Sequence, residues 1–190
     1  MLTPRLVRRC GSARAIGPAF VEGHDVAFAK KSTVDLSGKA TLSAGEASLR
    51  QYGVLFEIAR VDLDNLDREE GAGTGYDRID RFPVVHAASK EIEHALTYVA
   101  SLRHDGLKPY DWYLALVVQG AIEHGLPEAQ IDRFRSTPCI PDPDPARKRR
   151  QEALDVLQAA GCSDPLAILV PTGSPERKTK GIEREDVEGT

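Results

Sequence analysis

The sequence predicts an α+β fold, in which strands come first along the chain and helices follow. Segments with the composition of strands fill much of the first hundred residues, joined by short hairpin-like links. Two segments with the apolar spacing of helices come next. All eleven Phe, Tyr and Trp residues lie between Phe20 and Phe134. Because aromatic side chains supply much of a buried core, the compact unit is expected to end near residue 135.

Five segments are expected to be strands, after a helix that opens the chain. Thr3 followed by Pro4 is a favoured helix start, since threonine caps free N–H groups and proline fits the first turn. Residues 52–58 are apolar enough to be buried on both faces, and Pro83 indicates a bulge or a sheet edge. The expected strands, which would form a curled and largely antiparallel sheet, are residues 24–30, 39–42, 52–58, 76–87 and 93–100.

Two helices follow the strands. Residues 111–123 carry apolar residues on one face, with a proline just before them and Gly125 as their stop. Residues 127–135 begin with a proline in the first turn, and Ile131 and Phe134 form their apolar pair. These helices complete a domain that is expected to span residues 1–137.

The remaining residues, 138–190, are expected to form a tail. Residues 138–145 are proline-rich and predict a stiff, extended linker. Residues 146–160 have the spacing of a short amphipathic helix, although its basic start opposes the helix dipole. Residues 166–170 are apolar and could dock on the domain, and the last twenty residues are polar enough to stay disordered.

Residues 62–71 form an acidic segment that reads as a short helix. Leu63 and Leu66 give its apolar pair, and Gly71 supplies a left-handed stop. Asp67, Glu69 and Glu70 then crowd the last turn, where the helix dipole already disfavours negative charge. A carboxyl group in such a place suits general acid/base catalysis, and a solvated acidic helix end is the alternative.

The surrounding motifs resemble the γ-glutamylcyclotransferase superfamily, which includes the AIG2-like proteins. The resemblance covers roughly residues 1–135, and it implies a small mixed β-barrel with helices packed outside. No single motif is specific, but five occur in the family's order. They are the Gly53-Val54 strand, Leu66-Asp-Arg-Glu-Glu-Gly71, Tyr76-Asp-Arg78, Lys108-Pro-Tyr-Asp-Trp-Tyr-Leu114 and Gly120-Ala-Ile-Glu-His-Gly-Leu-Pro127.

The resemblance implies a reaction and a set of site residues. The α-amine of a γ-glutamyl group would attack its own γ-carbonyl, forming 5-oxoproline and releasing an amino acid or amine. Glu70 falls on the family's acid/base, with Glu69 as the fallback, and no cofactor or metal is implied. The other expected substrate-binding residues are Tyr113, Gly71, Tyr76 and Arg78. A core role for Tyr113, and an ion pair of Arg78 with Asp67 or Asp77, are the alternatives.

One departure from the family pattern bears on activity. Members of the family carry a strand ending in Tyr-Gly-Ser-Asn, whose loop holds the substrate's carboxylate and amine, and Met1–Leu6 resembles the residues just after it. We therefore expect that the start has been placed too late and that residues 1–190 have weak or no activity. The alternative is a non-catalytic protein of the same fold that binds a small molecule or a partner.

The composition of the chain bears on whether the protein binds nucleic acid, a membrane or a metal ion. A net charge of −4 gives no electrostatic footprint for nucleic acid, and no apolar run is long enough to span a membrane. The three cysteines form no CxxC pair, which favours reduced thiols in the cytoplasm. The five histidines show no metal-binding spacing. The expected partner is a small-molecule γ-glutamyl substrate, and the oligomeric state stays open.

Overall fold

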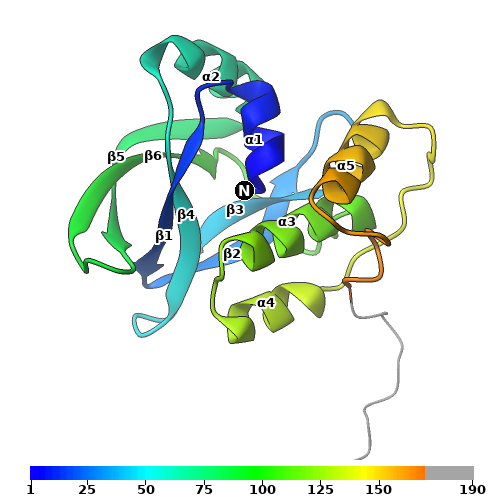
Figure 1. Cartoon of the computed structure of the whole chain (residues 1–190). Helices are drawn as coiled ribbons and strands as arrows, with labels where there is room; N and C mark the ends of the chain where they lie inside the picture. Colours follow the sequence, from blue (N-terminus) through cyan, green and yellow to red (C-terminus); the bar gives the residue numbers. More distant parts are fainter. Residues whose placement is uncertain (170–190) are drawn as a thin grey trace, which may run out of the picture.

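The computed structural model describes residues 1–169 and has the α+β architecture that the sequence predicts. Two antiparallel sheets lie beside a layer of helices (Figure 1). Between β4 and α2, residues Arg60–Asp62 form one turn of 3-10 helix. The helices and strands are α1 (Thr3–Arg9), β1 (Arg14–Glu22), β2 (His24–Lys31), β3 (Gly38–Ala44), β4 (Arg50–Glu57), α2 (Leu63–Glu70), β5 (Tyr76–His86), β6 (Ile92–Ala100), α3 (Asp111–Glu123), α4 (Glu128–Arg135) and α5 (Lys148–Ala159).

The larger sheet has the order β4-β1-β5-β6, and β2 pairs with β3 in the smaller one. All pairs between these strands are antiparallel. β2 also contacts β4, and β3 contacts β6, so the two sheets curl around a common interior. The β5–β6 register shifts between Ile79 and Phe82, directly before Pro83, close to the bulge expected there.

The sequence did not predict β1, although it lies at the middle of the larger sheet. Gly17 and Pro18 interrupt its pattern, and its register against β4 shifts between Ala15 and Gly17. Pro18 lacks an N–H and lies where the pairing of β1 with β5 ends, next to the Ala19–His86 pair. Its carbonyl still accepts from the Ala87 N–H at 2.9 Å, directly after the end of β5.

The expectation that residues 52–58 are buried on both faces is wrong. Gly53 and Glu57 are exposed and most of their neighbours are only half-buried, because β4 borders an internal cavity and an edge of the sheet. Gln130 of α4 covers that edge. Its side-chain Oε1 accepts from the Tyr52 N–H at 2.9 Å, and its Nε2 donates to the Tyr52 carbonyl at 3.0 Å.

Neither α1 nor α2 begins with a side-chain cap, although Thr3 was expected to cap α1. Leu2, not Thr3, occupies the N-cap of α1, and the Thr3 N–H donates to Glu123 Oε2 at 2.9 Å. Asp62 occupies the N-cap of α2, but its carboxylate accepts from the Ser12 N–H and hydroxyl instead. In both cases a tertiary contact satisfies the polar group in place of a local cap.

Residues 148–159 form α5, within the helix expected at 146–160, and α5 packs against α3. Ala153, Val156 and Leu157 are buried with Trp112 in one hydrophobic cluster. The linker before α5 is anchored through Asp142, which accepts from Trp112 Nε1 at 2.8 Å and from Arg147 Nε at 2.7 Å. The domain division at residue 137 stays a prediction, and the tail expected to be disordered, residues 171–190, lies outside the described residues.

Candidate active site

Helix α2 carries the candidate acid/base, and it is fixed to α1 by its apolar side. Leu66 is buried with Leu6 and Cys10, and the Asn65 side chain donates to the Arg9 carbonyl. Gly71 ends the helix with φ of 71° and ψ of 43°, as expected for a left-handed stop. The chain therefore turns sharply after Glu70. The side chain of Glu70 lies on the side of the helix that faces the cavity.

A cavity of about 1300 Å³ lies inside the curled sheets. All six strands and the helices contribute to its wall, and the N-terminal end of the chain lies between the sheet and α3 in Figure 1. Four of the five expected site residues line it, namely Glu70, Gly71, Tyr76 and Tyr113. Arg78 is not among the lining residues.

Glu70 is held in place by an arginine that the sequence reading did not single out. Arg9 Nη1 donates to Glu70 Oε1 at 2.7 Å, and Arg9 Nε lies 3.6 Å from Glu69 Oε2. The Glu70 side chain is 20% exposed and that of Glu69 is 38% exposed. Of the two glutamates, Glu70 is therefore the more enclosed and the better oriented.

Tyr76 and Tyr113 both bind the backbone of one residue of β3, Ala40. The Tyr76 hydroxyl donates to the Ala40 carbonyl at 2.9 Å, and the Tyr113 hydroxyl oxygen accepts from the Ala40 N–H at 3.1 Å. Burial raises the pKa of both phenols, so both stay neutral at neutral pH. Because Tyr113 uses only its oxygen here, its own hydrogen remains available as a donor on the cavity wall.

Arg78 points to its neighbours instead of the cavity. Its Nη1 donates to Asp67 Oδ2 at 2.6 Å, and its Nε lies 2.8 Å from Asp80 Oδ1. The Tyr98 hydroxyl donates to the other oxygen of Asp67 at 2.7 Å. Arg78 thus forms the ion pair with Asp67 that was its alternative interpretation. Together with Arg9, it explains how the acidic end of α2 is tolerated.

Besides Arg9, five cationic side chains line the same cavity, namely Arg5, Lys30, Lys39, Arg68 and Arg149. Arg5 and Arg9 stand one turn apart on α1, a spacing that is visible in the sequence, and Arg149 comes from α5. Lys39 Nζ donates to Asp35 Oδ2 at 3.0 Å and lies 4.6 to 5.9 Å from the ring centres of Tyr110, Trp112 and Tyr113. The wall of the cavity therefore carries more positive charge than the acidic segment at residues 62–71 indicated.

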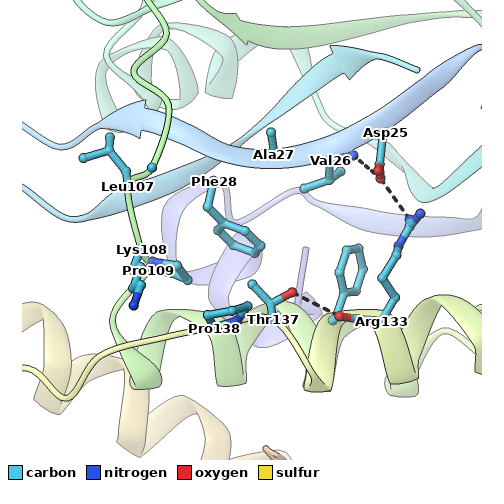
Figure 2. A pocket seen from close by; sticks show the side chains of 12 residues that line it. Asp25, Val26, Ala27, Phe28, Leu107, Lys108, Pro109, Arg133, Thr137 and Pro138 are labelled. Atoms are coloured by element: carbon cyan, nitrogen blue, oxygen red, sulfur yellow. Dashed lines mark hydrogen bonds and ion pairs between the residues drawn. The ribbon is translucent and has the colours of Figure 1, made fainter. Parts of the chain in front are cut away.

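A second, smaller cavity of about 420 Å³ lies between β2 and α4 (Figure 2). Phe28 and prolines 109 and 138 give it a largely apolar wall. Two of its charged residues, Asp25 and Arg133, are engaged with each other, since Arg133 Nη2 lies 3.1 Å from Asp25 Oδ1 and also donates to Gln51 at 2.7 Å. This arrangement offers little chemistry, and the larger cavity is the candidate active site.

Two further questions about the described part of the chain are whether it holds a metal-binding cluster and whether a helix could span a membrane. Within residues 1–169, no three His, Cys, Asp or Glu side chains gather where they could hold a metal ion. No helix in that range has the length and apolar character needed to cross a membrane.

Known proteins share this architecture. Residues 50–134 match the model of the AIG2-like family. A gamma-glutamyl cyclotransferase structure superposes with a TM-score of 0.72 at 19% identity, over 81% of this chain and 92% of that one. The uncharacterised human protein loc79017 gives 0.71 at 20% identity with the same coverage. YkqA from Bacillus subtilis gives 0.57 at 19% identity, over 73% of this chain and 50% of that one. A search of curated proteins found no match.

Proposed function

We propose that the chain cyclises γ-glutamyl compounds, because residues 50–134 match the model of the AIG2-like family and the fold resembles that of a gamma-glutamyl cyclotransferase. The products are 5-oxoproline and an amino acid or amine, and Glu70 is the general acid/base. The observation that carries the proposal is Glu70 itself, a carboxylate on the cavity wall whose position is set by Arg9.

The chemistry requires few groups from the protein. The α-nitrogen of the substrate attacks the γ-carbonyl carbon, a C–N bond closes the five-membered ring, and the bond to the leaving nitrogen breaks. Attack within one molecule already gives a high effective concentration, up to ~10⁵ M or more in well-oriented cases. The attacking ammonium gives up two protons as it becomes the lactam N–H, and the leaving nitrogen takes up two and departs as an ammonium. The protein must fold the substrate and relay these protons. One carboxyl group performs both transfers.

The wall around Glu70 supports this assignment. Gly71 follows it in a left-handed conformation, so the backbone turns away from the carboxylate without a side chain in between. Tyr113 offers a neutral hydroxyl on the same cavity, suited to hydrogen-bond a carbonyl or carboxylate oxygen. Tyr76 fixes the adjacent β3 backbone through Ala40.

The test is release of 5-oxoproline from a panel of γ-glutamyl amino acids and γ-glutamyl amines. The assay compares the wild-type chain with Glu70→Gln and with Glu69→Gln as the matched control, and it includes any longer form that the gene encodes. Glu70→Gln is expected to lower kcat by roughly 10²–10⁴-fold, the usual contribution of general acid/base catalysis. Glu69→Gln should retain most of the activity.

Two results would contradict the proposal in different ways. Full activity in Glu70→Gln would remove Glu70 from the mechanism but leave the reaction. No 5-oxoproline from any substrate or form would reject the enzyme. A non-catalytic protein that binds small molecules on the same fold would then remain.

A further inference from the structure

Arg5 is a cation on the cavity wall without an evident partner. It stands on α1 one turn before Arg9, and both side chains line the cavity. Arg9 is occupied by Glu70 and Glu69. Within residues 1–169, Arg5 has neither an ion pair nor a side-chain hydrogen bond to the protein.

The surroundings of Arg5 make this lack of a partner costly. Burial lowers the pKa of Arg5 to about 10, and the nearby charge of Arg9 acts in the same direction. The guanidinium still keeps its proton at neutral pH, so a charge is held in a partly desolvated place. Such a charge is normally compensated by an anion, and ionisable groups perturbed in this way gather at functional sites.

The other guanidinium and ammonium groups of the cavity have contacts of their own. Arg68 Nη1 donates to Asn65 Oδ1 at 3.2 Å, and Lys30 Nζ lies 5.2 Å from the ring centre of Tyr76. Lys39 is held by Asp35 at 3.0 Å and by Ser37 at 2.9 Å. The Arg149 side chain is 45% exposed and lies 3.9 Å from Glu69. Arg5 therefore presents the freest guanidinium fork on the wall, and that fork matches the two oxygens of a carboxylate.

A second donor faces the same space. The Tyr113 hydroxyl hydrogen has no acceptor among the described residues, because the oxygen accepts from the Ala40 N–H. Arg5 and Tyr113 both line the wall of the cavity. A guanidinium and a hydroxyl donor that face one cavity can together bind one carboxylate.

We propose that Arg5, assisted by the Tyr113 hydroxyl, binds a carboxylate of the ligand that occupies this cavity, which makes the cavity selective for acidic small molecules. This inference deepens the proposed function, and its substrate class rests on that function. The bound carboxylate is that of the glutamyl group, which γ-glutamyl amino acids, γ-glutamyl amines and the product 5-oxoproline all carry.

Binding tests the proposal without any turnover. The ligands are 5-oxoproline and 2-pyrrolidone, which share the lactam ring and differ in the carboxylate, and affinities are measured by ligand-observed NMR. Wild-type protein should prefer 5-oxoproline, and Arg5→Gln should weaken its binding on the order of 10–100-fold with little effect on 2-pyrrolidone. Arg5→Lys should recover only part, since an ammonium lacks the fork.

Arg8→Gln is the matched control, because Arg8 is exposed on the same helix and donates only to the Glu152 carbonyl at 3.5 Å. Thermal unfolding of each variant separates a binding defect from a folding defect. The proposal is overturned if wild-type protein shows no preference for 5-oxoproline. It is equally overturned if folded Arg5→Gln keeps that preference, or if Arg8→Gln loses it.

Kinetics test the same assignment. Because Arg5 holds the glutamyl carboxylate, Arg5→Gln should raise KM for γ-glutamyl alanine and γ-glutamyl ethylamine alike. A rise for γ-glutamyl alanine alone would place Arg5 at the carboxylate of the leaving amino acid and would overturn the proposal. If binding depends on the carboxylate but no 5-oxoproline is released, Arg5 keeps its role and the proposed reaction is rejected. If Arg5→Gln is active with unchanged binding and KM, the reaction stands and the role of Arg5 is rejected.

Discussion

Arg9 and Glu70 join the first and second helices of the chain across the mouth of the cavity, with Arg9 Nη1 2.7 Å from Glu70 Oε1. The Asn65 side chain, which donates to the Arg9 carbonyl, ties the same two helices a second time. The orientation of the candidate acid/base thus depends on a residue 61 positions earlier in the chain. Because a carboxylate acts only when correctly placed, this pair is the first target for mutation.

Arg9→Gln is expected to lower kcat for 5-oxoproline release on the order of 10–100-fold, because Glu70 loses the group that fixes its position. KM should change little, since Arg9 is engaged by glutamates and not by the ligand. The pH profile of kcat should also shift, which a loss of stability alone would not cause. Arg14→Gln is the control, as Arg14 forms an exposed pair with Glu57; equal losses in both variants would argue against a specific role.

The two tyrosines on Ala40 should respond differently to removal of their hydroxyls. Tyr76→Phe removes a donor to the Ala40 carbonyl and is expected to cost roughly 1–2 kcal/mol of unfolding free energy, with KM unchanged. Tyr113→Phe leaves the Ala40 N–H unpaired and also removes the free donor of the cavity, so both stability and KM should suffer. Urea unfolding and steady-state kinetics check both variants. Identical kinetic effects would refute the distinction.

Gln130→Ala should destabilise the sheet through the exposed edge of β4. The Tyr52 N–H loses its acceptor, whereas the Tyr52 carbonyl keeps the Gln51 side chain as a donor. The expected cost is roughly 1–3 kcal/mol, or several degrees in Tm, measured by calorimetry. Gln158→Ala on the exposed side of α5 is the control and should leave Tm nearly unchanged.

Stability should fall in acid partly through Asp35. Burial tends to raise the pKa of this carboxyl, but hydrogen bonds from Ser37 and Lys39 outweigh burial and hold the pKa at about 2. Because the pKa is lower in the folded state than in the unfolded chain, ionised Asp35 stabilises the fold above pH 4. This contribution, roughly 2 kcal/mol in total, is lost as the pH falls towards 2. Asp35→Asn should therefore be less stable at pH 7 and show a flatter decline between pH 4 and 2. Urea titrations test this, with the exposed Asp64→Asn as the control.

Local signals were sufficient to predict most elements. Gly71 and Gly125 mark helix ends by needing left-handed backbone, with φ of 71° and 60°, and composition alone located the strands from β2 to β6. β1 was missed because Gly17 and Pro18 are usually turn residues. What makes them acceptable is the limited pairing of β5, which is a property of the sheet and not of the segment.

Only those residues of the candidate site that belong to a recognisable sequence motif were predicted. Glu70, Gly71, Tyr76 and Tyr113 do line one cavity, although their roles stay predictions. Arg78 was identified from its motif, but the roles of Arg5, Arg9 and Arg78 could not be told apart from the sequence, because those roles depend on tertiary partners. Arg9 meets Glu70, Arg78 meets Asp67, and Arg5 meets neither. The difference between a structural ion pair and an available cation appears only when the helices are assembled.

Trp112 is the chain's single tryptophan, and its position gives the protein a built-in optical reporter. The indole lines the cavity, lies 4.9 Å from Lys39 Nζ, and donates to Asp142 of the linker before α5. Tryptophan fluorescence of the protein therefore comes from this one side chain, and its emission intensity and its emission wavelength report on two different events. A ligand entering near Lys39 would alter the emission intensity, whereas detachment of α5 would expose the ring to water and shift the emission to longer wavelength.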